Sequence, residues 1–172
     1  QFYQTFGREF SSTRQRLQPG VVRVLDMLDG NEIILDLGCG NGELVRDLMR
    51  RGHTGSYTGL DFSLSLLQTA RRGWEDAPAT FLQADLFSPG WDALITKNKP
   101  NRFNLVTALA VLHHIPTVER RLDLLNTIHS LLLPGGRFIH SEWQFLNSPR
   151  LKERIQPWSE ILYRGRDSAL VC

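Results

Sequence analysis

Residues 33–42 read Ile33-Ile34-Leu35-Asp36-Leu37-Gly38-Cys39-Gly40-Asn41-Gly42, and Glu43 follows. The run 33–37 is typical of a strand buried on both faces, and 43–51 has the pattern of a helix. Three alternate glycines let the backbone turn sharply and approach a ligand where a Cβ would collide. The N–H groups that open the helix favour a polar or anionic group there. This stretch predicts a strand, a ligand-binding turn and a helix.

Two other interpretations of this turn stay open. The dinucleotide fingerprint G-x-G-x-x-G would need its third glycine where Glu43 stands, and an acidic side chain there would repel a pyrophosphate. A glycine-rich connection that binds nothing is the other alternative.

Outward from this stretch, strand-like and helix-like segments alternate. Strands are expected over 57–60, 80–82, 103–108 and 137–143. Helices are expected over 17–28, from Ser63 to residue 70, and over 117–133, where Pro134-Gly135-Gly136 stops the last one. A brief helix is expected within 91–97. This alternation predicts an α/β fold, a doubly wound and mostly parallel sheet.

The composition fits one ordinary globular domain. The chain has 172 residues, 41% hydrophobic and 22% charged, which excludes intrinsic disorder, collagen and a coiled coil. The longest nearly apolar stretch, Leu105 to Leu112, is far shorter than the ~20 residues that a membrane helix needs. Two cysteines indicate no disulfide framework and favour a cytoplasmic setting. A net charge of +2 neither demands nor excludes a nucleic-acid partner.

Acidic residues follow the next two expected strands. Asp61 ends one, the position from which a carboxylate accepts hydrogen bonds from both ribose hydroxyls. Asp85 follows the other and can accept a hydrogen bond from an adenine amine, with Leu86 and Phe62 sandwiching the ring. The alternatives are that Asp61 or Ser63 only caps a helix, and that Asp85 is a solvated loop residue.

The order of these motifs resembles the doubly wound, Rossmann-like S-adenosylmethionine-dependent methyltransferases, over residues 33 to about 143. It comprises the turn 34–42, Gly59-Leu60-Asp61-Phe62-Ser63, Ala84-Asp85, and Leu132-Leu133-Pro134-Gly135-Gly136. The resemblance implies that Asp36 and the glycine turn hold the methionine part of the cofactor, Asp61 the ribose and Asp85 the adenine amine. The cofactor would be S-adenosyl-L-methionine and its product S-adenosyl-L-homocysteine. We expect these cofactor-binding residues: Asp36, Gly38, Cys39, Gly40, Asn41, Gly42, Asp61, Phe62, Ala84, Asp85, Leu86, Leu109 and Ala110.

The resemblance also sets the expected organisation. Residues 1–172 form a single domain, with an N-terminal lid or helix over 1–30, a cofactor-binding core over 31–145 and an irregular or helical tail over 146–172. Nothing after Trp143 resembles the antiparallel hairpin that usually completes such a sheet. Either the sequence is truncated, or the fifth strand is a sheet edge that the tail covers.

A finer resemblance covers 110–121, which includes His113 and His114. It is similar to the tRNA wobble-uridine methyltransferases, which methylate the carboxylate of 5-carboxymethyluridine. An ionised carboxylate needs no base; for a hydroxyl or an amine, His113 or His114 is the candidate catalytic base. Alternatively, one histidine packs and caps the next helix while the other faces the pocket. Arg14, Tyr3 and Trp143 are the expected substrate contacts.

The lid would consist of Phe2, Tyr3, Phe6 and Phe10, whose alternative role is core packing of an N-terminal helix. The pairs Arg71-Arg72 and Arg120-Arg121, with basic residues of the tail, favour a tRNA acceptor; a solvated helix face is the common alternative. We expect a methyltransferase that acts on a modified tRNA wobble uridine and needs neither a metal nor a membrane. A small-molecule methyltransferase and a non-catalytic cofactor-binding subunit are the alternatives.

Overall fold

The computed structural model describes residues 17–72, 78–96, 102–142 and 145–153. The chain divides after Glu142 into two units, which are described separately below. The first unit contains the whole sheet.

Five parallel strands form that sheet in the order β3-β2-β1-β4-β5. They are β1 (Ile34–Leu37), β2 (Tyr57–Asp61), β3 (Ala79–Gln83), β4 (Phe103–Leu109) and β5 (Leu132–Ser141). The chain runs from β1 outward to β3 and then crosses back to β4, so the strand order reverses beside β1. Ligands of open α/β sheets bind outside the carboxyl ends of the strands at such a reversal.

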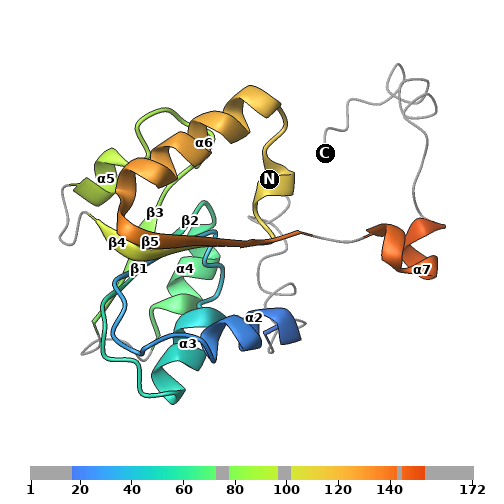
Figure 1. The fold of residues 1–172 in the computed structure, drawn as a ribbon. Helices are drawn as coiled ribbons and strands as arrows, with labels where there is room; N and C mark the ends of the chain where they lie inside the picture. The colour runs from blue at the N-terminus through green and yellow to red at the C-terminus, as the bar shows by residue number, and fades with distance from the viewer. Residues whose placement is uncertain (1–16, 73–77, 97–101, 143–144, 154–172) are drawn as a thin grey trace. The chain divides into compact units, whose positions relative to one another are not determined.

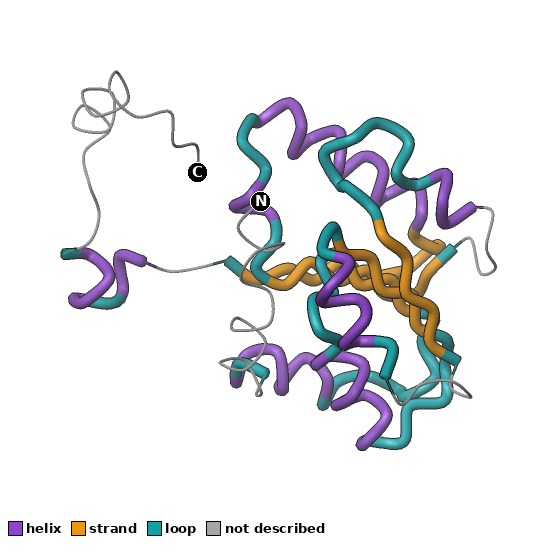
Figure 2. The backbone as a smooth tube through the Cα atoms, turned by 180° about the vertical axis from the view of Figure 1, so that it is seen from behind, coloured by secondary structure: helices purple, strands orange, loops and turns teal. Residues whose placement is uncertain are grey.

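Helices cover both faces of the sheet. On one face lie α2 (Pro19–Leu25), α3 (Glu43–Arg50) and α4 (Leu64–Ala70); on the other lie α5 (Ala93–Thr96) and α6 (Val118–Leu131) (Figure 1). Figure 2 shows the same layers from behind. The predicted doubly wound α/β fold is confirmed.

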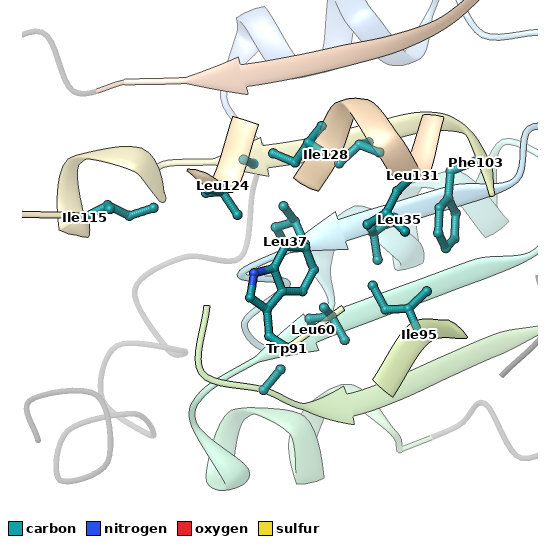
Figure 3. Close-up of a cluster of buried hydrophobic side chains, with 13 residues drawn as sticks. Leu35, Leu37, Leu60, Trp91, Ile95, Phe103, Ile115, Leu124, Ile128 and Leu131 are labelled. Atoms are coloured by element: carbon teal, nitrogen blue, oxygen red, sulfur yellow. The ribbon is translucent and has the colours of Figure 1, made fainter. Parts of the chain in front are cut away.

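Each helical layer packs on its own apolar cluster. Leu35, Leu37 and Leu60 of the sheet meet Leu124, Ile128 and Leu131 of α6, as Figure 3 shows. On the opposite face, Ile34 and Tyr57 pack with the buried side chains of α2, α3 and α4. Strand β1 is buried on both faces, which explains its continuous apolar run.

The segment around Pro134-Gly135-Gly136 differs from the prediction. Helix α6 ends at Leu131, and β5 begins at Leu132 rather than at Arg137. Leu132 pairs with Phe103, the register then shifts, and regular pairing continues from Arg137 with Leu105. The strand thus absorbs a segment whose glycines and proline predicted only a loop. The side chains of Ser63 and Thr117 cap α4 and α6.

The second unit contains a short 3₁₀ helix, η2 (Phe145–Asn147), and α7 (Pro149–Lys152). The irregular or helical tail expected over 146–172 continues past this point into 154–172, which lies outside the described residues. Within the described ranges, no helix is long and apolar enough to cross a membrane.

Candidate functional site

The glycine turn leaves space beside it at the carboxyl edge of the sheet. Gly40 has φ +56°, and a Cβ built on it would meet no atom of the described residues within 4 Å. Gly38 is confined instead, because its Cβ would lie 2.5 Å from Cγ2 of Val111, in the segment after β4. The turn therefore packs tightly against the protein at Gly38 and stands open at Gly40.

Asp36 is a buried carboxyl in the strand that leads into the turn. Tyr57 Oη donates to its Oδ2 at 2.6 Å, and Thr107 Oγ1 donates to its Oδ1 at 2.7 Å. Burial raises the pKa of Asp36 to about 6, the two hydrogen bonds oppose that rise, and nearby Asp61 adds to it. Ionised Asp36 would therefore be stabilised by a cationic ligand.

Asp61 joins the ends of β1 and β2. Its Oδ2 accepts from the Gly40 N–H at 2.9 Å, and its Oδ1 accepts from the Ser63 N–H at 2.8 Å. Burial raises the pKa of Asp61, and these two backbone donors partly offset the rise. The carboxylate thus holds the open part of the turn, while Ser63 caps α4.

Glu32, just before β1 at the opposite edge of the sheet, is a buried carboxylate with hydrogen-bond and charged partners inside the protein. Burial would raise the pKa of Glu32, but backbone N–H groups, including those of Asp29 and Gly30, together with His53, lower it overall. Glu32 also lies 3.6 Å from Arg137. Within the described ranges, by contrast, neither Asp36 nor Asp61 has a cationic partner. Asp36 and Asp61 are therefore buried carboxyls that a positively charged ligand would stabilise.

Asp85 follows β3 at the same edge and forms a local turn. Its Oδ1 accepts from the Phe87 N–H at 2.9 Å, and its Oδ2 from Ser88 Oγ at 3.1 Å. Ala84 is buried, whereas the ring of Phe62 is 45% exposed, as expected of a group with room for a partner. Leu86 packs at the margin of the core.

The end of β4 is held in an unusual conformation at Ala110. This residue has φ +57°, although it is not a glycine. Its N–H donates to both the carbonyl oxygen and the Oγ of Ser141, each at 3.0 Å. Left-handed backbone at a non-glycine residue is costly and clusters at functional sites. The ends of β4 and β5 are thereby pinned together at the predicted site.

Both histidines lie beyond this point, in the 3₁₀ helix η1 (Leu112–His114). Their rings are 4.1 Å apart between centroids. His113 Nδ1 lies 3.2 Å from Oε2 of Glu142, the residue after β5. Thr117, and not a histidine side chain, caps the next helix.

A cavity of about 220 Å³ borders the site on the face covered by α2 and α3. Its walls are mostly apolar, and Thr107, Leu109 and Ser141 line it where it meets β4 and β5. Because Thr107 also binds Asp36, the cavity adjoins that buried carboxyl. Of the two expected cofactor contacts at the end of β4, Leu109 lines this cavity, and Ala110 is the next residue along the chain.

The remaining residues of the glycine turn that were expected to contact the cofactor are Cys39, Asn41 and Gly42, and the structure describes all three. The Cys39 side chain is buried against Gly59, and burial, with Asp36 and Asp61 nearby, raises the pKa of its thiol. Gly42 is the N-cap of α3. Asn41 and Arg46 both donate to Glu43, so the first turn of α3 carries a carboxylate. Arg46 pairs with this carboxylate at 2.8 Å and offsets its charge, so the argument from Glu43 against a pyrophosphate stays a prediction.

Some predicted residues cannot be placed. Tyr3, Arg14, Trp143 and the other aromatic residues of the expected lid lie outside the described residues. Within the described part of the chain, no group of histidine, cysteine or acidic residues is arranged to hold a metal ion.

Sequence reasoning missed the residues that support the site from neighbouring strands: Tyr57, Thr107, Ser141 and Glu142. Thr107 could have been found from the register of the two strands, because it lies directly opposite Asp36 in the pairing of β1 with β4. The remaining contacts depend on how side chains pack and could not be read from spacing.

Comparison with known proteins agrees with this geometry. The family described as a methyltransferase domain matches residues 10–167. The chain belongs to this family. A solved S-adenosylmethionine-dependent methyltransferase from Mesorhizobium loti is 31% identical, with a TM-score of 0.56 over 72% of this chain and 52% of that one. The resemblance to S-adenosylmethionine-dependent methyltransferases drawn from the motifs is thereby confirmed.

Two relatives carry the finer resemblance. The mouse tRNA (carboxymethyluridine(34)-5-O)-methyltransferase ALKBH8 is 31% identical over 147 residues, which cover 83% of this chain and 19% of the mouse protein. The bovine probable tRNA methyltransferase 9B is 26% identical, over 95% of this chain and 34% of that protein. This methyltransferase domain therefore spans only a minor part of the length of these relatives.

Proposed function

We propose that this chain is the catalytic domain of an S-adenosylmethionine-dependent methyltransferase, with a carboxylate-bearing uridine of tRNA as its methyl acceptor. The observation that carries the cofactor assignment is the open turn at Gly40 between the two carboxyls Asp36 and Asp61. A ligand there needs positive charge and hydroxyl donors, and S-adenosylmethionine has both.

The residues present fit this cofactor, and they divide its parts among themselves. Asp36 would hold the cationic amino-acid part, Asp61 the ribose hydroxyls, and Asp85, with Leu86 and Phe62, the adenine. The bound cofactor supplies an electrophilic methyl group, so the chemistry needs no further activation. The chain's contribution is to orient the acceptor in line with that group and to exclude water.

The acceptor is proposed from the relatives and from the edge of the sheet. The tRNA methyltransferase relatives align over most of this chain. His113 and His114 follow the carboxyl end of β4, where an acceptor would meet the cofactor. A carboxylate acceptor is ionised at neutral pH, so these histidines would bind and orient it rather than remove a proton.

A small metabolite is the second candidate acceptor, and one observation favours it. Arg71 donates to the Phe81 carbonyl and Arg121 to the Ile115 carbonyl, both at 2.8 Å. These guanidinium groups are partly engaged by the fold, which weakens the case for a phosphate-binding surface.

Transfer of labelled methyl groups should distinguish these acceptors. With methyl-tritiated S-adenosylmethionine, we expect label to enter tRNA that carries 5-carboxymethyluridine and to be released by mild alkali, as from a methyl ester. The initial rate should be nearly flat above about pH 5, because an ordinary carboxyl is already ionised there. A rate that instead rises through the range in which histidine titrates would indicate a base and a different acceptor atom.

The same tRNA with unmodified uridine is the control and should take up no label. Label in a metabolite extract, but not in tRNA, would favour the second candidate. Cofactor binding without any transfer would indicate a non-catalytic subunit.

Asp61→Asn should weaken S-adenosylmethionine binding by about tenfold, or ~1.5 kcal/mol, because a charge-assisted acceptor for the ribose is lost. Asparagine keeps one acceptor oxygen, so either the Gly40 N–H or the Ser63 N–H loses its partner, and thermal unfolding checks that the turn and the fold are retained. Titration calorimetry measures the affinity, and Asp47→Asn, which alters a surface pair with Arg51, is the control. An unchanged affinity in Asp61→Asn would mean that Asp61 serves only to hold the turn.

A further inference from the structure

We infer that Glu142 is a positioning residue for His113, which it holds in the tautomer that carries its proton on Nδ1. The inference rests on the proposed function, since it concerns the histidine placed beside the acceptor. It starts from one contact, the 3.2 Å between His113 Nδ1 and Glu142 Oε2.

The chemistry of the two groups decides where the proton lies. An ionised carboxylate has no hydrogen to donate, so the imidazole nitrogen that faces it must carry one. In the neutral ring, Nε2 is then the nitrogen with the lone pair. Glu142 thereby makes Nε2 the atom that gains a proton when the ring becomes charged, and in that form the Nε2–H can donate to a carboxylate acceptor.

The contact between Glu142 and His113 is held in place by hydrogen bonds between the ends of β4 and β5. Ser141 precedes Glu142 and binds the Ala110 N–H through both its carbonyl oxygen and its hydroxyl. From Ala110 the chain enters η1, which is anchored by Ile115, buried in the core beneath α6. The segments that carry Glu142 and His113 are therefore linked through the hydrogen bonds between Ser141 and Ala110.

A second histidine faces the same carboxylate at longer range. His140 Nδ1 lies 3.7 Å from Glu142 Oε1, beyond hydrogen-bond distance, and its ring stacks on Phe138. The neighbouring ring of His114 contacts His113 as well. His114 and His140 thus lie close to the pair, and the 3.2 Å contact between His113 Nδ1 and Glu142 Oε2 is short enough to select a tautomer.

Nitrogen-15 NMR of the histidine rings tests the inference directly in the whole chain. At about pH 8.5, above the ordinary range of histidine titration, the His113 signals should show a protonated Nδ1 and an unprotonated Nε2. In Glu142→Gln the carboxamide can either accept or donate, so the Nε2–H form of His113 should become populated. His140→Phe keeps the stack on Phe138 and should leave the His113 tautomer unchanged. The His113 signals are assigned by their loss in His113→Gln.

An unchanged His113 tautomer in Glu142→Gln would overturn the inference, as would a tautomer shift in His140→Phe equal to that in Glu142→Gln. Methyl transfer is a separate measurement, in which Glu142→Gln should lower the rate by about tenfold or more at unchanged cofactor affinity. If the parent chain transfers no methyl group, the proposed function fails, while the NMR result still shows whether Glu142 sets the tautomer. If the tautomer shifts but the transfer rate stays the same, Glu142 has no positioning role in the reaction.

Discussion

Gly40→Val should reduce the affinity for S-adenosylmethionine by more than about a hundredfold while leaving the chain folded. A Cβ at Gly40 enters space that is empty among the described residues, so the valine side chain would stand where the proposed ligand lies. The left-handed φ of +56° adds a backbone cost of about 1–2 kcal/mol, which a domain of this size can tolerate. Titration calorimetry measures the affinity, and thermal unfolding confirms the fold.

Gly52→Val is the matched control for this experiment. Gly52 also has a left-handed φ, +79°, and also has no atom within 4 Å of a built Cβ. It follows the carboxyl end of α3, away from the glycine turn that precedes that helix. The two variants should lose similar stability, and only Gly40→Val should lose the cofactor. Equal affinities in both would remove the glycine turn from the binding site.

Much of the fold was predictable because its signals are local. The continuous apolar runs predicted β1 and β4, and Ser63 and Thr117 mark the starts of α4 and α6 in the sequence as in the structure. The beginning of β5 was not predictable in this way. Leu132 pairs with Phe103 ahead of the register shift, and Gly135, inside that shift, keeps a left-handed φ of +77° before regular pairing resumes at Arg137.

In the candidate site, too, some residues have local sequence signals and others depend on contacts between strands. Asp36, Asp61 and Gly40 could be found because each ends a strand or forms a turn, and the carboxyl ends of parallel strands share one edge. Ala110 was among the expected cofactor contacts, but its conformation gave no signal, because alanine has no preference for left-handed backbone and Ser141 holds it from another strand. The contact between Glu142 and His113 depends on this imposed turn, so it required the structure.

The affinity for S-adenosylmethionine should fall by about a hundredfold as the pH drops from 7 towards 4, and Asp36 should cause most of the fall. Burial raises the pKa of Asp36 to about 6 in the free protein. A cationic ligand stabilises the carboxylate, so the pKa of Asp36 falls in the complex and binding releases a proton. Affinity is therefore fully present above about pH 6 and is lost as the pH falls through that value. If the cofactor returns the carboxyl to its ordinary pKa of 3.8, the two protonation states differ in affinity by about a hundredfold.

Asp36→Asn separates this effect from general acid sensitivity. The carboxamide has nearly the same shape, and the hydroxyls of Tyr57 and Thr107 can rotate to accept from it, so the buried network is kept. Asp36→Asn should bind S-adenosylmethionine more weakly at pH 7, and its affinity should lose most of the pH dependence. The pH dependence that remains is assigned to Asp61, whose pKa is also raised by burial. S-adenosylhomocysteine, which keeps the ammonium but not the sulfonium charge, should show the same pH dependence as the cofactor if Asp36 faces the amino-acid part. Calorimetry at several pH values measures all three, and a pH profile that persists unchanged in Asp36→Asn would show that the carboxyl does not meet the ligand's charge.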